Sequence, residues 1–421
     1  MHNVEIVLNN IEQGGFIVWT VDAGNGHVAP IEDYWPSGTY MQDGVVYSPL
    51  ENINSNSISV DFEPFQSGEQ LVSSLKFKIL WDDGNYDVGN NGQIIYYDIY
   101  FNYRYLNLYI SKDSQALIES FVFQSDGEIF FLPYIRRPIM DSSNLWDFET
   151  VYGYSGPIST NENTEFLELA WQNFKRLMKK IGIIAGLIRF HPFFNNDRFC
   201  TNNSLEVHYE RDTVWIDCSR DLTEVLGDYS KKHLRQLNSL EAKGVKVCPS
   251  NDVNDLHKFG EIYLEKMRSI NAREEYHFDR EYFNGITKLG SNNWMVYLAY
   301  TPNSKIMGGC LLLFSERFCH YHLSGSLKEY IKYKPNDMLR HTVIKDMLES
   351  NIEKIHFGGG LTRDINDGLF SFKLKFSKQL CQFKVGYCIV DEKKYKSLCE
   401  KWEAKYPEKQ EFANFFLKYR Y

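Results

Sequence analysis

The clearest alternation of apolar and polar positions lies between residues 320 and 376. The run HYHLSGS at 320–326 alternates with a period of two, which is typical of a half-buried strand. The run KIHFGGG at 354–360 predicts a second strand, which three glycines bring to an end. A basic stretch at 332–339 leads into a helix between them. The pattern therefore predicts a crossover connection and parallel pairing of the two strands.

A third run, LFSFKLKF at 369–376, carries lysines among aromatic residues and predicts a further strand. In a strand, alternation would place Lys373 and Lys375 on one face and the apolar side chains on the other. Helix N-termini and strand ends are where such folds bind phosphates and other ligands. We therefore expect the active site in this part of the chain.

The rest of the pattern predicts a mixed α/β (α+β) fold. A helix over 163–182 should bury one face, made of Phe166, Leu167, Ala170, Phe174 and Met178. A helix over 221–243 should begin at the cap Asp221 and end at Gly244. The remaining predictions are strands over 94–101, within 120–137, and over 184–194, 205–218 and 245–249, a helix over 255–268, a hairpin around 301–305, and a charged helix pair broken at Pro407.

Charge divides the chain near residue 90. Residues 1–90 hold 13 Asp and Glu but only two Lys, whereas the whole chain of 421 residues carries a net charge of −9. Strand-like runs and turn signals alternate in this first segment. The sequence therefore predicts an acidic, β-rich accessory module at 1–90 that folds on its own.

Composition excludes several classes of protein. No run of about eighteen apolar residues occurs, and the N-terminus lacks the pattern of a signal peptide, so we expect no membrane span and no secretion. The eight cysteines form no CxxC pair and lie mostly in apolar strand patterns, which is typical of reduced thiols. We therefore expect a cytoplasmic protein. The acidic chain does not suit DNA as a partner.

Seven short motifs occur in the order found in a known family. They are VYGYSGPI (151–158), RFHPFF (189–194), TVWIDC (213–218), YLEKMRSINAREEYHF (263–278), HYHLSGS (320–326), HFGGG (356–360) and FKLKF (372–376). Together they resemble the Fem-type proteins, the FemABX peptidoglycan aminoacyltransferases and their acetyltransferase-like relatives. The resemblance covers about residues 93–392 and leaves residues 1–90 mostly outside.

The resemblance implies two tandem GNAT-like lobes, at 91–215 and 216–392, with a cleft between them and a helical tail at 393–421. It also implies acyl transfer to an amine without a covalent enzyme intermediate. Some members take the acyl group from aminoacyl-tRNA and extend the peptidoglycan stem peptide. Others are thought to use acyl-CoA and to act on amino sugars. Members with a long helical hairpin for tRNA insert it in the second lobe, where residues 219–278 leave no room for it.

Acyl transfer to an amine requires removal of a proton and stabilisation of the carbonyl oxygen. His322 shares a strand face with His320 and is the first candidate base, because histidine titrates near neutral pH, and Asp337 is the second. Lys373 matches the family motif in which a lysine is thought to steady the donor carbonyl or phosphate. A lysine among aromatics needs a partner, either an anionic ligand or a structural ion pair. The histidine spacing is a weak zinc signal, so we expect no metal.

The donor should bind where the helix after residue 334 begins, because helix N-termini attract anions. Lys332 and Lys334 precede this point, and Asn336 is the expected N-cap. Backbone amides of HLSGS would donate to the carbonyl oxygen, and Ser324 and Gly325 permit close approach. A solvated basic loop and an ordinary turn are the alternatives.

The acceptor site rests mainly on the resemblance. It implies that four residues of the first lobe face the cleft and that two in the second lobe border the acceptor groove, namely Tyr152, Tyr154, Arg189, His191, Arg268 and Tyr276. Arg189 can grip a carboxylate or phosphate in a bidentate manner. Gly358 and Gly359 allow a tight turn or a close approach to a ligand.

The preferred function is N-acyl transfer from acyl-CoA, such as acetyl-CoA, to an amine of a cell-envelope or surface-polysaccharide precursor such as an amino sugar. The acceptor would be a small molecule or a lipid-linked glycan, which allows peripheral contact with a membrane. One alternative is an aminoacyl-tRNA-dependent transferase that builds peptidoglycan cross-bridges, with tRNA as partner. Another is a non-catalytic glycan-binding protein that keeps the scaffold.

Overall fold

The computed structural model describes residues 98–110, 115–125, 128–139, 145–315 and 317–421, and the backbone of strands that precede them. Those strands lie in the segment predicted to be β-rich: β1 (Asn3–Leu8), β2 (Gly15–Asp22), β3 (His27–Val28), β4 (Tyr40–Gln42), β5 (Val45–Pro49), β6 (Ser57–Asp61), β7 (Ser74–Trp81) and β8 (Tyr86–Asp87). The chain divides into unit 1, Met1–Tyr209 with Phe383–Tyr421, and unit 2, Glu210–Gln382. The predicted boundaries at 90, 215 and 392 stay predictions.

Unit 1 contains a mixed sheet in the order β20-β13-β11-β10-β9-β1-β6, with β12 beside β10. The strands after the first segment are β9 (Leu117–Ser125), β10 (Glu128–Pro138), β11 (Trp146–Glu149), β12 (Ile158–Ser159), β13 (Ile183–Arg189) and β20 (Gln379–Ile389). Because β1 runs parallel to β9, the N-terminal segment contributes strands to this sheet. A second sheet has the order β4-β5-β2-β7-β8, with β3 beside β2.

Helix α2 (Thr164–Lys180) covers the unit 1 sheet, as its sequence predicts. Asn163 caps it by accepting hydrogen bonds from the amides of Glu165 and Phe166. All five apolar residues predicted for the buried face are buried. Phe174 packs edge to face against Phe121 and Phe148 of the sheet. The predicted strand at 94–101 falls partly outside the described residues; residues 98–110 form η3 (Ile99–Phe101) and α1 (Tyr103–Ile110) instead.

The tail packs onto unit 1 through a buried ion pair. Helix α9 (Glu392–Lys405) is followed only by the 3-10 turns η7 (Gln410–Phe412) and η8 (Lys418–Arg420), so the predicted second helix is wrong. The Arg420 guanidinium donates to both carboxylate oxygens of Asp147, each at 2.6 Å, and to the carbonyls of Arg137 and Pro138. Asp147 is fully buried, so this contact holds the last turn of the chain in place.

Unit 2 contains a sheet in the order β15-β16-β17-β18-β19-β14. Its strands are β14 (Glu206–Asp217), β15 (Lys246–Ser250), β16 (Trp294–Tyr300), β17 (Ile306–Phe314), β18 (Phe318–Ser326) and β19 (Lys354–Gly358). Between β18 and β19 lie η6 (Lys328–Tyr333) and α7 (Pro335–Leu348), and the two strands pair in parallel. The predicted crossover and the β16–β17 hairpin are therefore confirmed.

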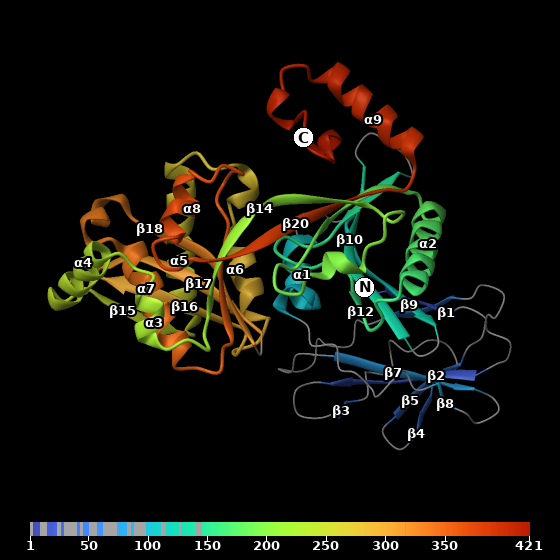
Figure 1. Cartoon of the computed structure of the whole chain (residues 1–421), viewed down its shortest axis with the longest axis horizontal. Coiled ribbons are helices and arrows are strands. Elements are labelled where there is room, and N and C mark those ends of the chain that lie inside the picture. The colour runs from blue at the N-terminus through green and yellow to red at the C-terminus, as the bar shows by residue number, and fades with distance from the viewer. Residues whose placement is uncertain are drawn as a thin grey trace. The chain divides into compact units, whose positions relative to one another are not determined.

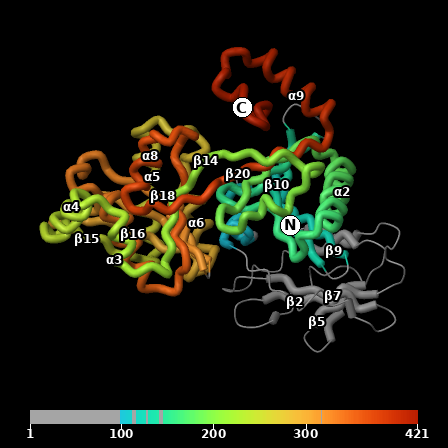
Figure 2. Tube along the Cα trace, viewed as in Figure 1, coloured from blue at the N-terminus to red at the C-terminus, as the bar shows by residue number. Residues whose placement is uncertain are grey.

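Helices cover both faces of the unit 2 sheet (Figure 1). Helices α4 (Lys231–Ala242) and α7 share one apolar core with Cys310 of β17. On the opposite face, Phe259 of α5 (Val253–Ser269) lies against Gly309, and Phe283 of α6 (Arg280–Thr287) packs on α5. The chain passes from unit 1 to unit 2 within β14 and returns within β20 (Figure 2).

Two predictions for unit 2 are wrong. The helix expected over 221–243 is interrupted: Asp221 caps the short α3 (Leu222–Leu226), which ends at Gly227, and Ser230 caps α4. The run at 369–376 is not a strand, because the carboxylate of Asp367 accepts hydrogen bonds from the amides of Leu369 and Phe370 and starts α8 (Gly368–Lys373). Lys373 is consequently 7% exposed, whereas the side chain of Lys375 is 48% exposed.

No helix in the described part of the chain is both long enough and apolar enough to cross a membrane. All eight cysteines are free thiols, as their sequence pattern predicts.

Replacing Arg420 with Gln should destabilise the protein, because it removes the main partner of a buried carboxylate. Breaking a buried ion pair on one side costs about 3–5 kcal/mol. We expect the free energy of unfolding, measured in urea, to fall by about 3 kcal/mol. The loss should lie at the lower end of the range because Arg137 Nε remains 3.4 Å from Asp147 Oδ1. The control is Lys418→Gln in the same turn, whose partner Glu403 is half exposed, with an expected loss of about 0–1 kcal/mol. Equal losses in the two variants would contradict this account.

Candidate active site

The parallel strands β18 and β19 pair over only three residues each. Phe318 pairs with Lys354, Cys319 with Ile355, and His320 with His356. On the other side, Tyr321 stands opposite Leu312 and Leu323 opposite Leu311, so His322 is an extra residue in β18. Such a bulge bends its strand and ends pairing. The β19-facing edge of β18 is therefore unpaired with β19 from Tyr321 to Ser326.

Neighbouring side chains of β18 point to opposite faces of the sheet, as in any strand. Tyr321 is buried in the core formed with α7, whereas the ring of His322 lies 2.6 Å from the Tyr282 hydroxyl of α6. At Gly325 a Cβ would come within 3.0 Å of the Tyr263 backbone in α5. The close approach that Gly325 permits is thus an approach to a helix, while Ser324 lies next to it on the unpaired edge.

His322 is poorly suited to act as the general base. Burial, and to a smaller extent the neighbouring His320, lower the pKa of its ring from 6.5 to about 3. A group with that pKa accepts protons weakly at neutral pH. Its Nε2 atom already shares a hydrogen bond with Tyr282, which stacks on Phe278. The ring therefore helps to hold α6 against the sheet.

Asp337 is buried in the first turn of α7 and has partners there. Its Oδ1 lies 3.1 Å from Nε2 of His233 in α4 and 3.9 Å from Nζ of Lys375. The His233 ring stacks on Tyr229. The carboxylate thus connects α7 with α4, which leaves it a less available base than the sequence suggests.

The N-terminus of α7 is poorly suited to bind a phosphate group. Asn336 is not the N-cap: Lys334 takes that position with φ 46°, and Asn336 donates to Ser326 Oγ from within the first turn. Pro335 has no amide hydrogen, and the amide of Asp337 donates to the Lys334 carbonyl. Lys334 Nζ donates to Gln236 at 2.5 Å, and Lys332 lies over the ring of Tyr333.

Lys373 and Gly359, both predicted site residues, come together in the structure. Lys373 Nζ donates to the Gly359 carbonyl at 2.6 Å. Burial, and then the charge of Arg340, lower the pKa of Lys373 from 10.5 to about 7. Gly358 has φ 71°, a conformation that favours glycine, so it makes the turn that aims the next carbonyl at the lysine.

Arg340 of α7 lies beside Lys373 and was missed by sequence reasoning. Its guanidinium carbon lies 4.4 Å from the ring centre of Tyr321 and 4.7 Å from that of Phe372. Arg340 is 3% exposed, and its Nε atom is buried without a hydrogen-bond partner among the described residues. The available signal was the spacing of Asp337, Arg340 and His341 on a helix whose other faces are largely apolar.

We call Arg211, Arg340 and Lys373 the cation cluster. Arg211 donates to the Gly360 carbonyl at 2.7 Å and pairs with Glu210 at 2.8 Å. Its charge also lowers the pKa of Lys373. The cluster therefore gathers three cations where β19 ends.

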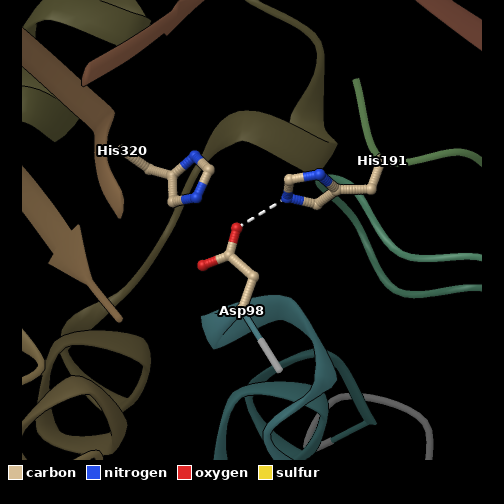
Figure 3. Close-up of side chains that lie close together, drawn as sticks. All are labelled: Asp98, His191 and His320. Carbon is tan, nitrogen blue, oxygen red and sulfur yellow. Dashed lines mark hydrogen bonds and ion pairs between the residues drawn. The ribbon is translucent and has the colours of Figure 1, made fainter. Parts of the chain in front are cut away.

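In unit 1, His191 and Arg189 are held by carboxylates. His191 Nε2 lies 2.7 Å from Oδ2 of Asp98, which sequence reasoning missed (Figure 3), and its ring stacks on Phe194. Arg189 donates to Glu149 at 3.0 Å and to the Thr150 carbonyl at 2.7 Å. Burial raises the pKa of Glu149, but Arg137 and Arg189 outweigh it and bring the pKa to about 2. Arg189 is thus engaged within the protein.

Tyr152 and Tyr154 belong to an aromatic set in unit 1. Tyr154 packs edge to face on Tyr100 and Phe383. Tyr152 lies beside Tyr109 and is 42% exposed, so its ring offers a face to a ligand. The aromatic set is therefore a better candidate for ligand contact than the engaged Arg189.

Arg268 and Tyr276 lie in unit 2, away from regular strand structure. Arg268 is exposed in the last turn of α5, and Tyr276 of η5 (Glu274–Tyr276) accepts a hydrogen bond from Arg273. Between residues 219 and 278, β15 separates α4 from α5. This segment thus contains no long helical hairpin, as expected.

Comparison with known proteins defines the class. Residues 228–365, which lie in unit 2, match the family described as acetyltransferase (GNAT) domain. The fold is similar to the crystal structure of FemX, with a TM-score of 0.55, 14% identity, and coverage of 70% of this chain and 93% of that one. The resemblance to the Fem type that the sequence predicts is thus confirmed at the level of the fold.

Two other solved structures are similar at lower scores. The C-terminal domain of a putative lysylphosphatidylglycerol synthetase from Agrobacterium fabrum has a TM-score of 0.46 and 15% identity, covering 68% of this chain and 90% of that one. A tandem GNAT protein from the clavulanic acid biosynthesis pathway has a TM-score of 0.43 and 10% identity, covering 66% and 84%. No curated protein matches the sequence.

We expect the His322 ring to stay neutral between pH 5 and 8. In the unfolded chain it titrates near 6.5 and in the folded chain near 3, so falling pH protonates the unfolded state first. His322 should therefore lower stability between these values, by up to about 1.4 kcal/mol per pH unit. NMR of the ring nitrogens as a function of pH would measure the pKa of His322, and the His322→Gln variant would assign its signal. A midpoint near 6.5 would contradict the buried environment.

Proposed function

We propose that this protein transfers an acyl group from acyl-CoA to an amine of a cell-envelope or surface-polysaccharide precursor, such as an amino sugar. The observation that carries the proposal is in the GNAT domain of unit 2. There β18 parts from β19 at a bulge, and the buried Lys373 lies where β19 ends. An acyl-transfer site needs donors and positive charge near the carbonyl oxygen, and a strand edge that leaves its neighbour near a cation can supply both.

In the proposed reaction, the donor thioester lies along the unpaired edge of β18. The amine attacks the carbonyl carbon, so that a carbon–nitrogen bond forms and the carbon–sulfur bond breaks. The nitrogen loses its proton to solvent, and the sulfur leaves as a thiolate. Negative charge develops on the carbonyl oxygen, where β18 amides and the Lys373 ammonium stabilise it. No covalent enzyme intermediate is needed.

Unit 1 by itself offers an aromatic face to a sugar. Tyr152 is half exposed beside Tyr109, and an aromatic face of this kind suits the apolar face of a sugar ring. Tyr154 belongs to the same aromatic set and packs edge to face against Tyr100.

The alternative donor is aminoacyl-tRNA. The fold likeness to FemX and the weak phosphate seat at the start of α7 favour it, whereas the lack of a helical hairpin between residues 219 and 278 favours acyl-CoA. Incubation with labelled acetyl-CoA or labelled aminoacyl-tRNA, each with glucosamine and with a peptidoglycan stem peptide, would separate the two. If neither donor is consumed but the protein binds glycan, the result would favour the alternative of a non-catalytic glycan-binding protein.

Lys373→Met should reduce acyl transfer by about 10²-fold or more, because it removes a charge that stabilises the developing oxyanion. The methionine keeps most of the side-chain stem, and no charge remains to be buried, so the melting temperature should be unchanged or higher. Lys375→Met, a change at an exposed neighbour, is the control and should retain activity. Similar turnover in both variants would remove Lys373 from the mechanism.

The charge state of Lys373 should also set the pH dependence. With a pKa of about 7, the lysine loses its proton as the pH rises through neutrality. If the charged form is required, kcat should fall above pH 7 in wild type. Lys373→Arg keeps its charge throughout, so any activity that it retains should lack this fall. A rate that rises through the same pH range would instead indicate that the neutral amine acts.

A further inference from the structure

Three aliphatic side chains of unit 2 are largely exposed to solvent. Ile331, Leu361 and Ile365 are 74%, 73% and 71% exposed, whereas no other large apolar side chain in the described part of the chain exceeds 52%. A single exposed aliphatic residue is ordinary. These three occur in only two loops, η6 and the loop at 359–367 after β19, so the exposure is concentrated rather than scattered.

The two loops leave the sheet of unit 2 at the same edge. η6 follows β18, and the second loop follows β19. These two strands pair in parallel, and the carboxyl ends of parallel strands meet at one edge of a sheet. The three aliphatic side chains therefore lie at the edge where Lys373 also lies.

The loop after β19 is held in place, although two of its side chains face solvent. The Asp367 carboxylate accepts hydrogen bonds from the amides of Leu361 and Thr362, at 3.0 and 3.1 Å. Arg363 pairs with Glu210 at 2.6 Å. The loop therefore presents its aliphatic side chains in a preformed position, which lowers the entropy cost of binding.

In η6 the aromatic residues are the ones that face the protein. Tyr330 and Tyr333 pack against the apolar core of unit 2, and the ammonium of Lys332 lies over the ring of Tyr333. Ile331 is left on the outside between them. A surface that binds single-stranded RNA offers aromatic rings on which bases stack, whereas this edge offers aliphatic side chains.

Cations adjoin the same edge. Gln236 of α4 accepts a hydrogen bond from Lys334 at 2.5 Å, so the first turns of α4 lie beside the end of η6 (Figure 1). These turns carry three exposed cations and no acid, namely Lys231, Lys232 and Arg235. Lysines at a helix N-terminus oppose the helix dipole, so the stability of α4 does not explain their position.

We propose that this edge of unit 2 docks on the surface of a bilayer that contains anionic lipids. The three aliphatic side chains enter the headgroup region, and the three α4 cations contact lipid phosphates. We call these six residues the docking face. A partner protein fits less well, because lysine is depleted in protein interfaces. The inference rests on the proposed function in one respect, since docking would bring the candidate active site to a lipid-linked acceptor where that acceptor is anchored.

The test measures binding of the full chain to lipid vesicles without either substrate. Vesicles of phosphatidylcholine alone are compared with vesicles that contain about one third phosphatidylglycerol, by sedimentation at several salt concentrations. Wild type should bind the anionic vesicles about tenfold more tightly or better, and salt should weaken this binding because it screens the headgroup charge.

The serine variants Ile331→Ser and Leu361→Ser should each weaken binding to anionic vesicles about tenfold, because each removes the burial of one aliphatic side chain. Val253→Ser is the matched control and should bind like wild type. Val253 is 43% exposed at the start of α5. It follows the carboxyl end of β15, which runs antiparallel to β18 and so ends at the opposite edge of the sheet.

The cations are tested by replacing Lys231, Lys232 and Arg235 together with Gln. This triple variant should bind anionic vesicles about 10²-fold more weakly at low salt, as expected for three lost headgroup contacts. Its binding should also depend less on salt than that of wild type. All replaced side chains are exposed, so the melting temperatures should stay close to that of wild type.

Several results would overturn the docking face. These are no vesicle binding by folded wild type, equal losses in Val253→Ser and Ile331→Ser, or tighter binding of a single-stranded RNA oligonucleotide than of anionic vesicles. A dimer of wild type that forms without lipid and that both serine variants dissociate would assign the aliphatic side chains to a contact between two copies instead.

Acyl transfer to free glucosamine separates this inference from the proposed function. Vesicle binding that depends on the docking face, without acyl transfer from any donor, would remove the proposed function and keep the docking face. Acyl transfer by a wild-type protein that binds no vesicles would do the reverse. If both hold, Ile331→Ser should retain transfer to free glucosamine and lose about tenfold in transfer to an amino sugar on a lipid anchor in anionic vesicles.

Discussion

The candidate site depends on the early end of the pairing between β18 and β19. Both strands belong to the buried sheet of unit 2, where an unpaired backbone edge is normally costly. The extra residue His322 makes the separation a built-in feature of β18, because the strand cannot resume its register with β17 and also follow β19. Alternation along β18 places Tyr321 in the core formed with α7 and His322 against Tyr282 of α6. The inserted residue thus lies where the edge opens and where the strand contacts helices on both faces.

Burial sets the electrostatics of the site. His322, Asp337, Arg340 and Lys373 all lie in places that water reaches poorly, yet they respond differently. Desolvation keeps the His322 ring neutral, whereas the Asp337 carboxylate lies 3.1 Å from the His233 ring. Burial and the neighbouring Arg340 lower the pKa of Lys373 to about 7, so its ammonium and neutral amine forms are both populated near neutral pH. Burial therefore gives two predicted site residues, His322 and Lys373, different charge states near neutral pH.

Long periodic segments of this chain could be predicted, and short ambiguous ones could not. The crossover from β18 to β19 follows from period-two alternation and a glycine stop, and α2 from one apolar stripe with an asparagine cap. The run at 369–376 fits a strand by alternation, but the side chain of Asp367 decides for a helix. Proline at 335 likewise moves the cap of α7 to Lys334. Arg340 belongs to no motif, and the pKa of His322 depends on burial that only folding creates; the roles of the site residues stay predictions.

Unit 1 is discontinuous in sequence, whereas unit 2 is a single uninterrupted stretch. The strand next to β13 and the arginine that neutralises Asp147 both come from residues after 382. During synthesis, unit 2 can therefore fold while unit 1 still lacks the strand next to β13 and the main partner of a buried acid. A ribosome-bound chain would then contain a folded unit 2 and an incomplete unit 1.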